Sequence, residues 1–264
     1  MSSNALPRQF ALDLGRAHQA SLANFLPGGD RALISALEKV AEQWAASTAL
    51  PATADASSLN HRWIYWWGAP GSGRSHLLHA LMHAAQNASL PYYYLRSNEP
   101  STWVKLEAEL PQQLKAGTPI AIAVDDVELL DERLSSALFR VLNAVRDNQQ
   151  LYVFIAGSDA PANLKLREDL RTRLAWGLVF QTHLLSDHEK IQALEQAASD
   201  RGLVLSPDVL PWLLSRFYRD MPNLMALLDA LDAYSLETKR AVTLPLVREL
   251  LQLSSSPNNE LMNR

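Results

Sequence analysis

Residues 63–75 restrict the fold of this chain more than any other stretch. Five apolar residues at 63–67 are followed by Gly68, and two further glycines, Gly71 and Gly73, precede Arg74 and Ser75. Glycines let the backbone curl so that successive N–H groups point into one concavity, and a helix that begins there adds the positive end of its dipole. This order predicts a phosphate-binding loop, with an ordinary glycine-rich turn as the alternative. The residues expected to line the loop are Gly68, Pro70, Gly71, Ser72, Gly73, Arg74, Ser75 and His76.

Three further apolar runs, at residues 92–95, 120–124 and 151–155, alternate with helical patterns. Runs this short and apolar throughout are typical of parallel strands that helices cover on both faces. We therefore expect an α/β domain with a mainly parallel sheet, preceded by a helix near residues 32–44. Residues 47–60, rich in alanine, serine, threonine and proline, are expected to be a flexible insertion.

The strand signal stops after Ser186, where helical patterns take over. Ser186 and Glu189 have the spacing of a capping box, and Ser206 followed by Pro207 marks a second helix start. These signals predict a small all-helical domain. The expected organisation is a flexible tail at 1–20, an α/β nucleotide-binding domain at 21–182, a helical domain at 183–253 and a disordered tail at 254–264.

The composition excludes several classes of protein. The chain has no cysteine, which excludes disulfides and thiolate metal sites, and its net charge of -4 is not the basic excess typical of autonomous nucleic-acid binders. No apolar run approaches the roughly 20 residues that span a bilayer, and the N-terminus lacks the apolar core of a signal peptide. We expect a cytoplasmic protein with no membrane partner.

Two acidic residues, Asp125 and Asp126, follow the apolar run at 120–124. In nucleotide sites of this kind the first acid and the serine of the loop hold Mg²⁺, and the second acid polarises the attacking water. We therefore expect Asp125 and Ser75 to be magnesium ligands and Asp126 to be catalytic, unless the acids merely open a loop. Asp159, at the tip of the next apolar run, is expected to position water or sense phosphate, with turn capping as the alternative.

Arg74 occupies the position at which this motif usually has lysine. Lysine is a compact point charge on a flexible stem, whereas arginine presents a bulky planar fork. We interpret the exchange as nucleotide binding that is retained and hydrolysis by the chain itself that is impaired.

Taken together, these residues resemble the AAA+ ATPases, and among them the DnaA-like branch. The matching motifs, in the family's order, lie at residues 68–75, 125–126, 157–159 and 170–177. The last motif, in which Arg173 is followed by Trp176 and Gly177, is characteristic of DnaA relatives. The resemblance implies an AAA+ α/β domain with a five-stranded, mainly parallel sheet, followed by the helical domain as the AAA+ lid. It also implies that Arg173 is an arginine finger acting in trans on a neighbour's nucleotide. A solvated surface cation is the alternative for Arg173.

The N-terminal residues Gln9, Phe10, Leu12 and Leu14 resemble the peptide by which bacterial proteins dock on the DNA polymerase III sliding clamp. The apolar side chains can fill a groove while the glutamine makes polar contacts. Chance or a simple core strand is the alternative for so short a pattern. The sequence ends soon after the helical domain, so we expect no helix-turn-helix DNA-binding domain. This combination resembles the Hda family, the regulatory inactivators of DnaA.

The resemblance implies a regulator that docks on the DNA-loaded clamp, meets DNA mainly through it, and stimulates ATP hydrolysis by DnaA. The resemblance implies that its own nucleotide is ADP, or ATP, in a mainly structural role. Whether magnesium accompanies the nucleotide and whether the chain forms a homo-oligomer stay open. Pro222 stands where this family has an arginine in the lid, which weakens the case for turnover by the chain itself. Two alternatives stay open: a self-assembling AAA+ ATPase, such as a helicase loader or DnaA-like remodeller, and a nucleotide-free scaffold.

Overall fold

The computed structural model describes residues 20–26, 28–46, 61–216 and 221–253, apart from the side chains of residues 222, 252 and 253. The chain divides into two compact units between Leu185 and Ser186. Each unit has its own apolar core and is described separately below.

The first unit is built on a sheet of five parallel strands, which confirms the predicted fold class. The strands are β1 (Trp63–Trp67), β2 (Tyr92–Leu95), β3 (Ile120–Val124), β4 (Leu151–Gly157) and β5 (Leu178–Gln181). Their order in the sheet is β2-β3-β4-β1-β5, so β1 lies between β4 and β5. Because all strands run in one direction, the loops that follow β1, β3, β4 and β5 leave the same edge of the sheet.

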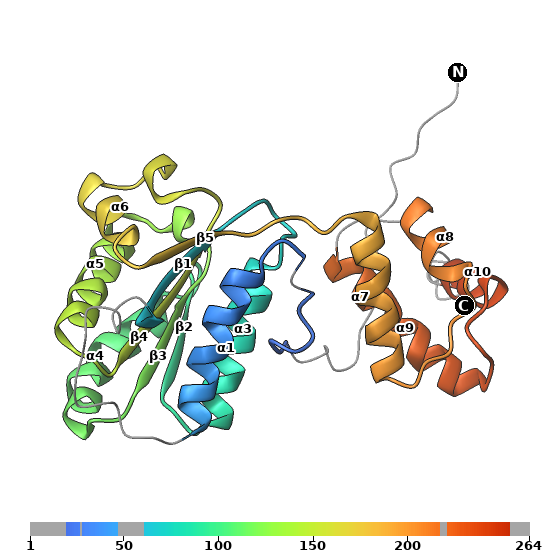
Figure 1. Cartoon of the computed structure of the whole chain (residues 1–264), viewed down its shortest axis with the longest axis horizontal. Helices are drawn as coiled ribbons and strands as arrows, with labels where there is room; N and C mark the ends of the chain where they lie inside the picture. The colour runs from blue at the N-terminus through green and yellow to red at the C-terminus, as the bar shows by residue number, and fades with distance from the viewer. Residues whose placement is uncertain (1–19, 27, 47–60, 217–220, 254–264) are drawn as a thin grey trace, which may run out of the picture. The chain divides into compact units, whose positions relative to one another are not determined.

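Helices cover both faces of this sheet (Figure 1). Helices α1 (Arg31–Ala45) and α3 (Arg74–Asn87) pack on one face, and α4 (Pro100–Ala116), α5 (Glu132–Asp147) and α6 (Glu168–Leu174) pack on the other. Alternate residues of β1 to β4 enter the two cores, as Ile64 and Trp66 do on the α1/α3 face and Trp63 and Tyr65 on the opposite face. Short 3-10 turns, η1 (Val127–Leu129) and η2 (Pro161–Asn163), follow β3 and β4.

The second unit is all-helical in the part that the structure describes, as the sequence predicts. It contains α7 (Asp187–Asp200), α8 (Val209–Arg216), α9 (Met221–Thr238) and α10 (Leu244–Leu253) around a leucine-rich core. The predicted capping box is present: the Ser186 hydroxyl accepts from the Glu189 amide, and the Glu189 carboxylate accepts from the Ser186 amide. Over the described ranges of both units, no helix is long and apolar enough to cross a membrane.

A substitution at Gly177 tests how tightly the start of β5 packs against β1. A Cβ at this position would lie 2.7 Å from the carbonyl carbon of Trp63, which is backbone of the buried strand β1 and cannot move aside cheaply. We predict that Gly177→Ala lowers the free energy of unfolding by about 1–3 kcal/mol, measured by urea denaturation.

Gly29→Ala is the matched control. Its added Cβ would lie 3.6 Å from His183 Nδ1, an ordinary contact distance. The control is expected to be neutral or stabilising by up to about 1 kcal/mol, because alanine restricts the unfolded chain. Equal effects of the two substitutions would contradict the tight packing inferred for Gly177.

Candidate functional site

The loop between β1 and α3 has the geometry predicted from its glycines. Gly71 and Gly73 have φ angles of 87° and 86°, a left-handed conformation that side chains disfavour, and Gly73 is the N-cap of α3. The Ser72 amide donates to the Ala69 carbonyl over 3.1 Å, which closes the turn. The first amides of α3 lack helical acceptors and point out of the helix start, so this loop is suited to an anion.

Thr182, the residue after β5, fixes the start of the loop. Its hydroxyl lies 2.7 Å from the Ser72 hydroxyl, and its amide donates to the Trp67 carbonyl over 2.7 Å. A Cβ at Gly68 would lie 2.5 Å from the Thr182 carbonyl oxygen, so only glycine fits there. Thr182 was not predicted from the sequence, where its single signal is its place shortly after the apolar residues 178–180.

The segment that precedes α1 lies against the loop. The Phe25 ring would come within 2.5 Å of a Cβ at Gly73, and its centroid is 5.8 Å from that of His76. Asp30, which is almost fully buried, accepts a hydrogen bond from the amide of His183 over 3.2 Å and pairs with His183 Nδ1 at 2.7 Å. These contacts tie the N-terminal segment to the loop and to the chain that follows β5.

Arg74 does not stand alone in the loop but is paired with two carboxylates. Its Nη2 lies 3.4 Å from Asp126 Oδ1 and its Nη1 lies 3.6 Å from Glu128 Oε1, with 11% of the side chain exposed. Asp126 has a left-handed backbone, with a φ of 47°. Burial, and after it the neighbouring Asp125 carboxylate, raises the pKa of Asp126, against the opposing effect of Arg74.

Glu128 is a functional candidate that the sequence analysis missed. Besides its contact with Arg74, its Oε2 accepts a hydrogen bond of 3.0 Å from the backbone amide of Ser158. Glu128 therefore joins the loop after β3 to the loop after β4 and to the start of α3. The signal in the sequence was an acidic residue so soon after Asp125. The sequence alone does not tell which of these acids points toward Arg74.

Asp125 is fully buried at the end of β3. Its Oδ2 accepts from the Tyr94 hydroxyl at 2.7 Å and from Arg96 Nη2 at 3.4 Å, and its Oδ1 accepts from the Asp126 amide at 3.1 Å. Both carboxylate oxygens are thus engaged by protein donors. Ser75, the other predicted magnesium ligand, lies in the first turn of α3.

Asp159 is held by its main chain rather than by its side chain. Its carbonyl oxygen accepts a short hydrogen bond of 2.5 Å from the Tyr65 hydroxyl, while its side chain belongs to an exposed residue. Burial is the largest cause that raises the pKa of Tyr65, and Glu128 adds to it. This bond fixes the loop after β4 to strand β1, and it leaves the predicted role of Asp159 open.

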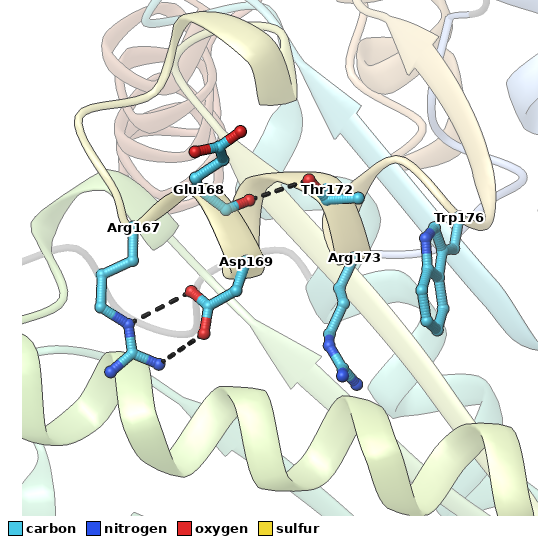
Figure 2. A pocket seen from close by; sticks show the side chains of 6 residues that line it. All are labelled: Arg167, Glu168, Asp169, Thr172, Arg173 and Trp176. Carbon is cyan, nitrogen blue, oxygen red and sulfur yellow. Dashed lines mark hydrogen bonds and ion pairs between the residues drawn. The ribbon is translucent and has the colours of Figure 1, made fainter.

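Arg173 lies on α6 in an open depression of about 740 Å³. The lining residues are Arg167, Glu168, Asp169, Thr172, Arg173 and Trp176 (Figure 2). The Arg173 guanidinium lies 3.9 Å from the ring centroid of Phe139 and 5.1 Å from that of Trp176. Arg167 is instead paired with Asp169 at 3.1 Å. No hydrogen-bond acceptor among the described residues reaches the buried Nη1 of Arg173.

Other predicted residues cannot be placed in this way. Gln9, Phe10, Leu12 and Leu14 lie outside the described residues, as does the side chain of Pro222 in the first turn of α9. Within the described ranges, no three histidine or acidic side chains gather as a metal-binding group.

Two family models match the chain. The model of the bacterial DnaA ATPase domain matches residues 35–181, and the model of the Hda lid domain matches residues 187–251. The first covers more than half of the 264 residues, and the two together follow the two units of the structure.

Solved structures share the fold at low sequence identity. Domain III of Thermotoga maritima DnaA matches with a TM-score of 0.66 and 21% identity over 90% of this chain and 98% of that one. Aquifex aeolicus DnaA bound to AMPPCP matches with a TM-score of 0.62 and 18% identity over 83% of this chain and 67% of that one. A variant of Thermotoga maritima RuvB matches with a TM-score of 0.60 and 14% identity over 89% of this chain and 72% of that one.

A substitution at Glu128 tests whether its contacts stabilise the loops of the site. We predict that Glu128→Ala lowers the free energy of unfolding by about 1–3 kcal/mol, because the Ser158 amide and Arg74 each lose an acceptor. Glu107→Ala is the control, since Glu107 also pairs with an arginine, Arg140, but on the exposed surface. Urea denaturation is expected to give at most about 1 kcal/mol for the control, and an equal loss in both variants would contradict a supporting role for Glu128.

Proposed function

The chain belongs to the DnaA-related AAA+ family and carries an Hda-type lid, and from this premise we propose that it regulates replication initiation by acting on DnaA. In this proposal the chain holds its own nucleotide in the loop at 68–76 and stimulates ATP hydrolysis by DnaA through Arg173. The observation that carries the proposal is the way in which aromatic rings hold the Arg173 guanidinium.

The Arg173 guanidinium is held in place while its charge stays available. The Phe139 ring supports it at 3.9 Å, and Nη1 has no hydrogen-bond acceptor in the part of the chain that is described. An aromatic ring attracts a cation without neutralising it and without using its N–H donors. The guanidinium carries further N–H donors besides the buried Nη1, and in this proposal it donates them to a phosphate oxygen of another molecule, as a catalytic finger does.

The place of Arg173 supports action on a partner rather than on the chain's own nucleotide. Arg173 belongs to α6, which packs on the face of the sheet opposite α3, and the loop at 68–76 leads into α3. We therefore propose that Arg173 enters the ATP site of an adjacent DnaA molecule.

The nucleotide of the chain itself is proposed to be ADP in a mainly structural role. The loop amides and the start of α3 suit phosphate, and a related fold, Aquifex aeolicus DnaA, was solved with AMPPCP. Arg74 already shares its charge with Asp126 and Glu128, which supports weak hydrolysis by this chain. Steady ATP turnover by the purified chain alone would favour a self-assembling ATPase instead.

The N-terminal residues Gln9, Phe10, Leu12 and Leu14 are proposed to dock on the DNA polymerase III sliding clamp. An extended peptide enters an apolar groove with alternate side chains, and these residues have that spacing. In this proposal the clamp brings the chain to DNA, and the protein acts in the cytoplasm at the nucleoid.

Arg173→Ala is the central test. We predict that it reduces the stimulation of DnaA ATP hydrolysis by about 10³-fold or more, because a finger supplies charge to the transition state. Radioactive phosphate release from ATP-bound DnaA in the presence of clamp-loaded DNA measures the effect. Arg140→Ala is the control, since Arg140 is an exposed arginine of α5 paired with Glu107. Unchanged stimulation by the Arg173 variant would refute the finger assignment.

The clamp proposal has a separate test. The double substitution Phe10→Ala and Leu12→Ala is expected to weaken binding to the purified clamp by about tenfold or more, because both apolar anchors are lost. Surface plasmon resonance measures the affinity, and Asn4→Ala in the same tail is the control. Equal binding by both variants would show that these residues are not the docking peptide.

A further inference from the structure

Nucleotide sites of this fold usually recruit Mg²⁺ with the acid at the end of β3 and the hydroxyl after the basic loop residue. Asp125 and Ser75 occupy these positions. The magnesium ion needs a carboxylate oxygen that can face the loop. Asp125 can offer such an oxygen only if its carboxylate is accessible and is not already held by other donors.

Asp125 does not fit this role in the observed arrangement. The residue has 0% exposure, and its two oxygens receive three donors from Tyr94, Arg96 and the Asp126 amide. The donor closest to Oδ2 is the Tyr94 hydroxyl, at 2.7 Å. Coordination of a metal through Oδ2 would disrupt a short hydrogen bond to a buried carboxylate, which is among the stronger kinds in proteins. Among the described residues Oδ1 accepts only the Asp126 amide, but it is buried with the rest of the side chain.

Tyr94 is held in the position from which it donates. It belongs to β2, where it pairs in register with Ala123 of the neighbouring strand. Its ring stacks on His79 of α3, with centroids 4.3 Å apart and planes 6° apart.

Arg96 supplies the positive charge that a metal would otherwise bring to Asp125. Its Nη2 lies 3.4 Å from Asp125 Oδ2, and its guanidinium lies 5.3 Å from the Tyr94 ring centroid. Its main chain is fixed as well, because the Trp103 indole donates to the Arg96 carbonyl over 2.8 Å. The buried carboxylate is therefore already neutralised by a resident cation.

We infer that the loop at 68–76 binds a nucleoside diphosphate without a divalent metal, with Tyr94 and Arg96 taking the place of the metal at Asp125. This inference rests on the proposed function, since it requires that the loop binds nucleotide. In this inference the phosphates are bound by the loop amides and by Arg74 alone. Tyr94 and Arg96 act as positioning residues, because they reach the site through Asp125.

The test is the affinity of the full chain for ADP, measured by isothermal titration calorimetry with Mg²⁺ or with EDTA after removal of copurified nucleotide. We expect the two dissociation constants to agree within about threefold. A dissociation constant that rises about tenfold or more in EDTA would overturn the inference and leave nucleotide binding itself intact. Absence of ADP binding under both conditions would overturn the proposed nucleotide site, and this inference with it.

Variants test the two residues directly. Tyr94→Phe removes a single hydroxyl, and the double variant Tyr94→Phe with Arg96→Gln releases Asp125 further; both are expected to bind ADP about tenfold more tightly with Mg²⁺ than with EDTA. Tyr93→Phe is the control, since its hydroxyl on the same strand donates to Glu109 instead. Affinity that stays indifferent to metal in the Tyr94 variants would refute the role of these residues. Cooperative urea unfolding of each variant verifies that it is folded.

Discussion

The parallel alignment of five buried strands is the constraint on which the rest of the α/β unit depends. Strand β1 lies between β4 and β5, and its side chains from Trp63 to Trp66 are fully buried. Because every strand ends at the same edge, the loops after β1, β3, β4 and β5 converge there. The glycine loop, the acidic residues and Thr182 are brought together by this register, and the cores on both faces stabilise it.

Charge balance governs what this edge can do. Asp125 is matched by Arg96, and Asp126 and Glu128 share Arg74. Paired charges are costly to separate in a partly buried site, because a lost partner leaves a charge in a medium that solvates it poorly. The arrangement favours a site that holds a ligand over one that repeatedly rearranges for turnover. It is consistent with the proposal that nucleotide serves this chain mainly as a structural component.

Arg173 has a contrasting environment at a different place on the same unit. Its guanidinium packs on the Phe139 and Trp176 rings and, among the described residues, forms no ion pair, although Glu168 and Asp169 line the same depression. Aromatic neighbours position a guanidinium without balancing its charge, whereas Asp126 and Glu128 balance the charge of Arg74. This contrast between two arginines is the physical basis for assigning one to the chain's own ligand and the other to a partner.

The local features of this protein could be predicted from its residues alone: the apolar strands, the glycine loop and helix start at 68–76, the acids at 125 and 126, and the capping box of Ser186 and Glu189. Each of these follows from short-range geometry, such as side-chain alternation, left-handed glycines or caps three residues apart. Which distant residues meet was settled only by the folded chain. Ser72 and Thr182 touch although they are 110 positions apart, and Tyr94 and Arg96 reach Asp125 from a neighbouring strand. Such contacts depend on strand order and register, which no local pattern encodes, so Glu128, Tyr94 and Arg96 emerged as site residues only in the tertiary structure.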